Sequence, residues 1–402
     1  MTIRSLIFWL HLTDGVVAGA VILVMSVTGV LLTYEKQMVA WAERSPLGAP
    51  PDPGAPRLSI DALVARVREA RPAATPVTLT FRASRDEPVT VSLGRDGQVL
   101  VNAYSGAVIG DGAVGLRAFF RSVTDWHRWL AATGEYRATG RAVTGACNIA
   151  FLVLVVSGSY LWLPKVWSRL QLRNITWFRR GLPGKARDFN WHNTIGFWSF
   201  APLFVVVLSA TVISYPWASN LVYRVVGENP PAPQRPAGPA PADRAAAGRE
   251  AGGRDFNRAG ATAPANLRDL DGQLARAEQQ LAGWRTITLR VPTTDAAPVV
   301  FTIDQGTGGQ PHKRGTLTLD RATGSVVKWE PFSSNSPGRR LRTILRFAHT
   351  GEVLGLPGQT IAGVASAGGA VLVYTGLALS LRRFLSWRRR RGGLDARQSS
   401  AA

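Results

Sequence analysis

The sequence has almost no cysteine. Its 402 residues include only Cys147, so an intramolecular disulfide is excluded. One thiol cannot supply the several thiolates of an iron–sulfur cluster or of a thiolate zinc site, and without a CxxCH segment haem cannot be attached covalently. The one GxGxxG segment, GDGAVG (110–115), is not expected to act as a phosphate loop, so we expect flavin, nicotinamide and iron–sulfur donors to reside on separate proteins.

Acidic residues are scarce too, which raises the question of a nucleic-acid partner. The chain has 26 Asp and Glu against 47 Lys and Arg, a net charge of +21. Residues 164–191 carry seven Lys/Arg and one Asp, and the tail from Arg382 onward carries seven Arg and one Asp, whereas residues 35–126 have eleven basic and ten acidic side chains. Short basic segments beside apolar spans are typical of the cytoplasmic side of a membrane and of contact with anionic lipids. No nucleic-acid partner is therefore expected.

Long apolar runs are abundant. A helix of about 20 apolar residues crosses a bilayer, and four runs reach that length. The first is too long for a signal peptide and continues into TYEKQ rather than into a small-residue cleavage site. Four buried helices of a soluble protein are the alternative, and the flanking Arg clusters argue against it. The runs cover residues 6–34, 142–163, 195–217 and 359–381.

These runs and the distribution of charge predict a multi-pass membrane protein with both termini inside and two long loops outside. The predicted segments are a first membrane helix (5–34), a first external domain (35–126), a second membrane helix with its external lead-in (127–163), a basic cytoplasmic loop (164–191), a third membrane helix (192–217), a second external region (218–348), a fourth membrane helix with its external lead-in (349–382) and a basic cytoplasmic tail (383–402).

The two external regions have the same order of predicted elements, one helix followed by three strands. Each third strand contains a similar turn, AYSGAV (103–108) in the first region and RATGSV (321–326) in the second. A unit of about 50 residues is small for independent stability, so we expect each to pack on the other or on the membrane helices. Residues 228–266 are rich in Pro, Ala, Gly and Arg and are predicted to form a disordered linker.

The membrane helices repeat in the same way. A histidine is followed by glycine four residues later and by a hydroxyl residue seventeen residues later in the first and third spans: His11, Gly15 and Thr28, and His192, Gly196 and Ser209. In the other two spans a histidine precedes a Ser/Thr-Gly step: His127 before Ser157-Gly158, and His349 before Thr375-Gly376. Two spans per repeat give both repeats the same orientation and predict a pseudo-two-fold axis along the membrane normal.

The third span departs from this pattern. There Ser209 is followed by Ala210, where the other three spans have Ser or Thr followed by Gly. We expect this departure to reflect packing and not to contact a ligand.

The histidines are the candidate ligands. The predicted topology places His11 and His192 near the cytoplasmic face and His127 and His349 at the external face, and the two-fold axis makes the members of each pair face one another. Ionisable residues in membrane helices are usually functional, imidazole is the commonest metal ligand, and bundle cores hold cofactors. With small residues nearby to admit a flat macrocycle, we predict two non-covalent haem b groups, one on each pair.

Other candidate residues leave alternatives open. Zinc or copper would need further ligands, for which Asp14 and Asp125 are available, so such a site fits less well. His312, in the polar segment QPHKRG, is expected to be solvated. Four arginines near the outer pair are candidates either for binding haem propionates or for reaching lipid headgroups: Arg128, Arg137, Arg141 and Arg346.

Together these motifs resemble the PepSY-associated transmembrane helix family, which includes bacterial inner-membrane ferric-siderophore reductases. The resemblance covers nearly the whole chain. It rests on FWLHLTDGVVAGAVILVMSVTGVLL, WHRW with SGSYLWLPK, WHNTIGFW and HTGEVLGLPGQTIAG, and the two turns resemble those of PepSY domains. It implies an inner-membrane protein with periplasmic PepSY-type domains, haem b on the four span histidines, and electron transfer from the cytoplasmic side to a periplasmic ferric complex.

The expected fold is therefore an integral membrane four-helix bundle with two small α+β PepSY-type domains outside. The expected function is haem-dependent reduction of a ferric siderophore or another periplasmic electron acceptor, fed by a separate cytoplasmic or membrane donor. A non-redox sensor acting through the PepSY-type domains is one alternative, but it leaves the paired histidines unexplained. A metal transporter is another, but it needs polar groups in the middle of the spans, where Asn148 is the main one.

Overall fold

The computed structural model describes residues 2–44, 48–52, 54–164, 168–232, 267 and 269–399. The chain forms two compact units. We call residues 1–37, 115–219 and 342–402 the helical unit, and residues 38–114 and 220–341 the sheet unit. Most of the predicted linker, from residue 233 to residue 266, lies outside the described residues.

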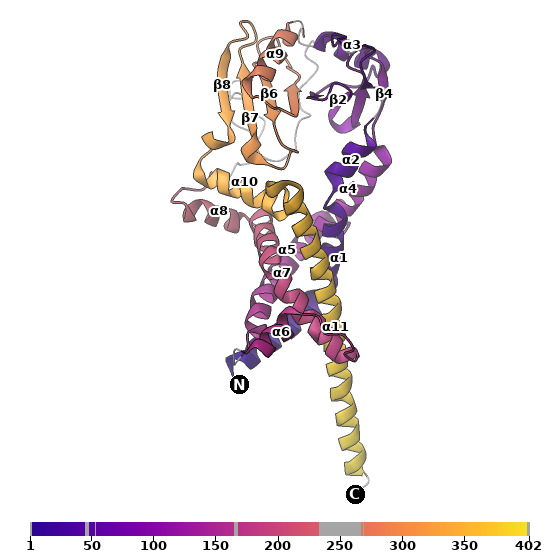
Figure 1. Ribbon diagram of the computed structural model, residues 1–402, viewed down its shortest axis with the longest axis vertical. Coiled ribbons are helices and arrows are strands. Elements are labelled where there is room, and N and C mark those ends of the chain that lie inside the picture. The colour runs from indigo at the N-terminus through magenta and orange to yellow at the C-terminus, as the bar shows by residue number, and fades with distance from the viewer. Residues whose placement is uncertain are drawn as a thin grey trace. The chain divides into compact units, whose positions relative to one another are not determined.

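Four long helices form the helical unit. Each packs against two others, so that α1, α5, α7 and α11 form a closed ring in which α1 lies opposite α7 (Figure 1). Within the described residues these four helices are long and apolar enough to cross a membrane. Their bounds are Ile3–Leu32 (α1), Tyr136–Trp162 (α5), Gly184–Ser214 (α7) and Gly355–Ser399 (α11).

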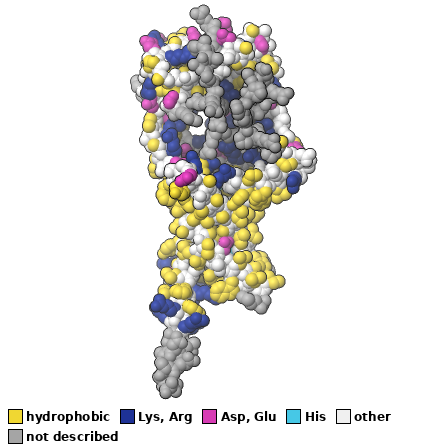
Figure 2. Space-filling model, turned by 180° about the vertical axis from the view of Figure 1, so that it is seen from behind, with side chains coloured by type: hydrophobic (Ala, Val, Ile, Leu, Met, Phe, Trp, Pro, Cys, Tyr) yellow, Lys and Arg dark blue, Asp and Glu magenta, His cyan; other side chains and the backbone are white. Residues whose placement is uncertain are grey.

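The surface of this unit agrees with a membrane setting. Large apolar side chains remain exposed along the helices, among them Val17 (78% exposed), Val364 (67%) and Trp198 (65%). Figure 2 shows hydrophobic side chains as a yellow band over the helices, with Lys and Arg gathered where α11 leaves the unit. An apolar surface of this extent is unusual for a soluble protein, but it is what lipid tails require.

Along the sequence, shorter helices alternate with the four long ones. They are α2 (Glu35–Ala42), α4 (Val114–Trp129), α6 (Arg169–Thr176), α8 (Pro216–Val225) and α10 (Pro337–His349), with a 3-10 turn, η5, over Glu352–Leu354. Residues 115–126 were predicted to belong to the first external domain, but they form α4 and belong to the helical unit. In the same way, α7 begins inside the predicted basic loop and α11 continues through the predicted tail. Hydropathy detects only the apolar part of a helix, whereas the backbone hydrogen bonds continue into polar sequence.

The sheet unit contains one continuous antiparallel sheet. Its strand order is β4-β3-β2-β1-β5-β6-β7-β8, so two four-strand meanders meet edge to edge at β1 and β5. Thr80 pairs with Thr288 at the centre of that junction, and their hydroxyl oxygens lie 3.1 Å apart. The strands are Thr78–Arg82 (β1), Val89–Ser92 (β2), Gln98–Val101 (β3), Val108–Gly110 (β4), Thr286–Arg290 (β5), Val299–Asp304 (β6), Arg314–Leu319 (β7) and Val326–Pro331 (β8).

Each half has four strands, where the sequence predicts three. The third predicted stretch of each half is divided by its turn, because Gly106 (φ 71°) and Gly324 (φ 64°) adopt the left-handed conformation that reverses the chain. The segments on either side then pair as separate strands, β3 with β4 and β7 with β8.

Two helices, α3 (Ile60–Ala70) and α9 (Leu270–Gln280), share one hydrophobic core with this sheet. The core is continuous across both halves, with Leu63 of α3, Leu270 of α9 and Phe301 of β6 all fully buried. Asp271 of α9 accepts a hydrogen bond from the backbone N–H of Ile60 at the start of α3, 2.9 Å away. The two small halves therefore stabilise each other.

Candidate functional site

The four span histidines lie in two pairs within the helical unit. His11 of α1 faces His192 of α7, with ring centroids 6.3 Å apart and ring planes at 86°. His127, near the end of α4, faces His349, the last residue of α10, with centroids 6.2 Å apart and planes at 52°. We call these the His11–His192 pair and the His127–His349 pair.

The two pairs lie far apart along the bundle. His11 is on α1, and His127 contacts Thr28 of the same helix, seventeen residues further on. At 1.5 Å per residue that separation is about 25 Å. It approaches the hydrocarbon thickness of a bilayer, about 30 Å. One pair therefore lies towards each end of the membrane-crossing part of the bundle.

Each histidine is held through its Nδ1 atom by a partner on another helix of the bundle. For three of the four the partner is a buried Ser or Thr hydroxyl. The contacts are His11 to Ser157 Oγ (2.8 Å), His127 to Thr28 Oγ1 (2.9 Å), His192 to Thr375 Oγ1 (3.0 Å) and His349 to the backbone oxygen of Val206 (2.9 Å).

The direction of these hydrogen bonds fixes the state of the imidazoles. Each hydroxyl donates its proton to the backbone carbonyl four residues earlier in its own helix, so it can only accept from the histidine. The three donations are Thr28 to Val24 (2.6 Å), Ser157 to Val153 (2.6 Å) and Thr375 to Val371 (2.8 Å). A carbonyl such as that of Val206 is always an acceptor. All four histidines are therefore assigned Nδ1–H, which leaves the Nε2 lone pair available as a ligand.

The glycine after each hydroxyl makes room for the ring. A Cβ atom at Gly158 would lie 3.3 Å from Cε1 of His11, and one at Gly376 would lie 3.4 Å from Cε1 of His192. The Ser/Thr-Gly step is thus a two-part cradle: the hydroxyl binds Nδ1 and the glycine admits the imidazole. The step recurs in the sequence, but its spacing alone does not indicate this role.

Gly15 and Gly196, two of the small residues expected to make room for a macrocycle, each lie beside a leucine of another helix. A Cβ atom at either position would lie 3.7 Å from a side chain, that of Leu154 for Gly15 and that of Leu372 for Gly196. The two positions are equivalent in the repeats, and so are their contacts. Their small size serves helix–helix packing, as is common between membrane helices.

As expected, Ser209 makes no hydrogen bond to a histidine, but the Ser209-Ala210 departure coincides with a different partner for His349. Ser209 is fully buried, yet its hydroxyl donates to the carbonyl of Val206 (2.9 Å), the same oxygen that accepts from His349. His349 is therefore held by a carbonyl where its three counterparts are held by a hydroxyl. Without a hydroxyl-to-ring contact, the glycine of the cradle is not needed.

Burial keeps the two imidazoles of the His127–His349 pair neutral. Burial, and to a smaller extent the neighbouring His349, lower the pKa of His127 to about 4. Burial also lowers the pKa of His349 below its ordinary value. Both rings are therefore uncharged near neutral pH, which is the form that binds a metal.

The donor set fits haem better than a bare metal ion. Two imidazoles bound to one metal at about 2.0 Å, with each ring centre about 1.1 Å behind its nitrogen, have centroids about 6.2 Å apart. The observed values are 6.3 and 6.2 Å. In the described part of the chain no group of three or more His, Cys, Asp or Glu is placed to hold a metal. Zinc or copper would lack ligands, whereas haem brings four nitrogens of its own and needs only the two axial ones.

Of the residues considered for zinc and for transport, Asp125 and Asn148 have other contacts, whereas the Oδ2 atom of Asp14 is buried and has no hydrogen-bond partner in the described part of the chain. Asp125 pairs with Arg137 at 3.6 Å. Asn148 donates to the carbonyl of Val207 (3.1 Å) and to Thr211 Oγ1 (2.9 Å), which ties α5 to α7. The mid-span amide is thus a structural link between two helices. His312 is exposed, in the 3-10 turn Pro311–Lys313 of the sheet unit.

The four arginines that the sequence places near the His127–His349 pair contact aromatic rings or a carbonyl. Arg137 and Arg128 lie over the ring of Trp129, at 3.6 and 4.7 Å from its centroid. Arg141 donates to the carbonyl of Ser214 (3.4 Å), and Arg346 lies 5.8 Å from the ring centroid of Phe347. The propionate role suggested for them stays a prediction.

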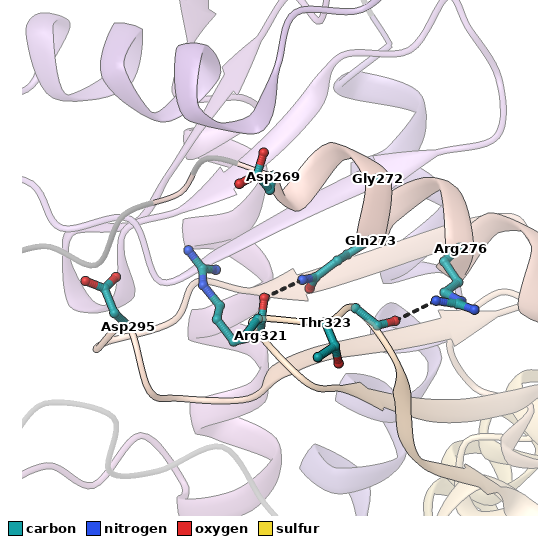
Figure 3. Close-up of a pocket in the computed structure, with 9 residues that line it drawn as sticks. Asp269, Gly272, Gln273, Arg276, Asp295, Arg321 and Thr323 are labelled. Carbon is teal, nitrogen blue, oxygen red and sulfur yellow. Dashed lines mark hydrogen bonds between the residues drawn. The ribbon is translucent and has the colours of Figure 1, made fainter.

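The sheet unit has a polar pocket of about 500 Å³ beside α9 (Figure 3). Gln273 donates to the carbonyl of Arg321 (3.0 Å) and Arg276 to that of Gly324 (2.8 Å), so α9 holds the turn at the end of β7. Two backbone N–H groups and the hydroxyl of Thr323 lower the pKa of Asp320 in the same turn. These contacts hold the turn of the second half in place.

Comparison with known proteins identifies the family. No curated protein matches the chain. The family model described as the PepSY-associated TM region matches residues 8–383, which include all four histidines and all four long helices. The protein is therefore an integral membrane helical protein that belongs to the PepSY-associated TM region family.

Proposed function

We propose that this protein is a di-haem b electron-transfer protein of the bacterial inner membrane that reduces a ferric siderophore, or another periplasmic ferric chelate, with electrons from a cytoplasmic-side donor. The observation that carries the proposal is the geometry of the histidines. Two pairs of imidazoles, each at the spacing of axial haem ligands and each with Nε2 available, lie about 25 Å apart along an apolar bundle. Two redox sites, one towards each face of the membrane, would divide the path of an electron across the bilayer into shorter steps.

His11 and His192 would hold one haem, and His127 and His349 the other. When bound, haem supplies reversible one-electron chemistry at a potential that the protein tunes through ligation, hydrogen bonding and burial. The chain's own part is positional. Ser157, Thr375 and Thr28 keep the Nδ1–H bond of their histidines oriented, and the apolar helices exclude water from the path between the sites.

The proposed orientation follows from the basic residues. Lys and Arg are concentrated in residues 164–191 and in the tail after Arg382, so that end of the bundle and both termini would face the cytoplasm. The His11–His192 pair would then receive electrons, and the His127–His349 pair would deliver them. The two halves of the sheet unit would be PepSY-type domains in the periplasm.

The proposed substrate follows from iron chemistry. Siderophores hold Fe(III) through hard oxygen donors, which bind the softer and less charged Fe(II) far less tightly. One electron added to the bound Fe(III) gives Fe(II) and favours its release, with no bond to the protein required. The donor would be a separate cytoplasmic or membrane component. The GxGxxG segment at residues 110–115 follows the antiparallel strand β4 rather than a parallel strand of a βαβ unit, and a single cysteine cannot hold an iron–sulfur cluster.

Reconstitution into vesicles tests the proposal. Dithionite is trapped inside, and a ferric hydroxamate with an Fe(II)-specific chromogenic chelator is placed outside. The wild-type protein and the control His312→Ala, which alters a histidine outside both pairs, should produce the external Fe(II) colour. His192→Ala should abolish it. Equal colour with His192→Ala, or none with the wild type, would contradict the proposed function.

A further inference from the structure

A buried acidic residue lies one helical turn from His192. Asp188 is four residues earlier on α7, so both side chains lie on the same face of that helix. Only 3% of Asp188 is exposed. Its Oδ1 pairs with Nη2 of Arg187 at 3.0 Å, and its Oδ2 pairs with Nη2 of Arg382 at 2.8 Å. A carboxylate at such depth is stable only because it is paired.

Arg382 lies on the same helix as Thr375, the hydrogen-bond partner of His192. It is on α11, seven residues after Thr375, so the two lie on the same face two turns apart. The Asp188–Arg382 ion pair therefore links the same two helices as the His192–Thr375 hydrogen bond, nearer the end of the bundle. Both contacts join α7 to α11.

Arg382 has binding capacity that the described residues do not use. Although 38% of the Arg382 side chain is exposed, its Nη1 atom is buried and has no hydrogen-bond partner among them. Gly184 borders this atom, and a Cβ atom there would lie 3.5 Å from it. Two arginines against one aspartate leave the cluster with a positive charge. A buried, charged donor without an acceptor is costly, and an anion at Nη1 would remove that cost.

The orientation of the His11–His192 pair indicates which anion would bind Nη1 of Arg382. The line from His11 to His192 crosses the bundle from α1 to the opposite helix α7, so a macrocycle between them has its plane along the bundle. One edge then faces the end where Asp188 and Arg382 lie. Haem b carries two propionate carboxylates, and arginine is the side chain best suited to bind a carboxylate.

We propose that Arg382 binds a propionate of the haem at the His11–His192 pair, and that Asp188 and Arg187 position its guanidinium. The inference rests on the proposed function. The cluster belongs to the second repeat alone, since the equivalent positions in the first are Ile7 and Pro164. One side of the pseudo-two-fold axis therefore determines which way the propionate edge of this haem points.

The test compares Arg382→Gln with Arg383→Gln in the full-length purified protein. Arg383 is the adjacent residue with the same charge, but it lies over the rings of Phe8 and Trp9, at 4.9 and 5.0 Å. Transfer of haem to excess apomyoglobin and the midpoint potential of each haem are measured. In Arg382→Gln, one haem should leave about 10-fold faster, a loss of the size seen for outer-shell partners. The potential of that haem should fall, because a positive charge that favours Fe(II) is gone, while the second haem keeps wild-type values and shows that the variant is folded.

Wild-type behaviour of Arg382→Gln, or equal effects of the two substitutions, would overturn the propionate assignment. A phosphate of an anionic lipid has similar chemistry and would be the ligand if Arg382→Gln lost its effect on haem in lipid-free detergent and instead weakened binding of phosphatidylglycerol. That outcome also overturns the assignment. A wild-type protein without haem would refute the proposed function itself, so the two failures are distinguishable.

Discussion

Replacing His192 with alanine is expected to remove one of the two proposed haems and leave the other in place. The substitution deletes one of the two axial ligands of the His11–His192 pair, so the protein would hold that haem iron through His11 alone and bind it more weakly. The His127–His349 pair lies about 25 Å away and shares no ligand with it, so it should retain its haem. The measurement is the haem-to-protein ratio by pyridine haemochrome, which should fall to about half, since one of two equivalent axial pairs is lost.

The reciprocal substitution makes this result specific. His349→Ala should also halve the ratio, and the double variant should contain no haem. His312→Ala is the matched control and should keep the wild-type ratio, because that histidine is exposed in the sheet unit. Loss of both haems from either single variant, or of none, would contradict the assignment of the pairs.

Replacing Thr375 with valine is expected to loosen the haem at the His11–His192 pair. Valine has the shape of threonine but no hydroxyl, so the buried Nδ1–H of His192 loses the acceptor that holds it at 3.0 Å. Loss of such a ligand partner weakens binding by about 10- to 100-fold. The rate of haem transfer to apomyoglobin should rise accordingly for one haem of the two.

Ser209→Ala is the matched control, since Ser209 occupies the repeat position of Thr28 in the first span. His349 uses the carbonyl of Val206, and removing the serine hydroxyl leaves that oxygen in place. This variant should therefore release haem at the wild-type rate, whereas Thr28→Val should release its haem faster. A Ser209→Ala variant that releases haem faster than the wild type would show that the hydroxyls act through packing rather than through the histidine.

The pairing of the histidines was accessible to sequence reasoning because the repeat preserves spacing. His11 and His192 share two offsets, and the direction of each span gives the depth. The hydrogen-bond partners of the histidine Nδ1 atoms could not be predicted from the sequence, because they depend on the register between antiparallel helices. Ser157 is 146 residues from His11, and only the packing of α1 on α5 brings them together.

The sheet illustrates the same limit. Alternation along the strands and the turns at Gly106 and Gly324 are local features, so the sequence indicates strands and turns. The junction of β1 with β5 is not local, since it joins residues about 200 positions apart. Thr80 and Thr288, the central pair, have nothing in their sequence to mark them as partners. Register across such a junction is determined by the common core beneath both halves.

The visible spectrum of the purified, detergent-solubilised protein tests the central claim most directly. Two neutral imidazoles on one haem iron produce the low-spin state, so reduction by dithionite should give a sharp α-band. Haem quantification should give two non-covalent haems per chain, one for each pair at 6.3 and 6.2 Å. A protein that is folded and monodisperse yet colourless, or one whose haem stays high-spin on reduction, would contradict the account.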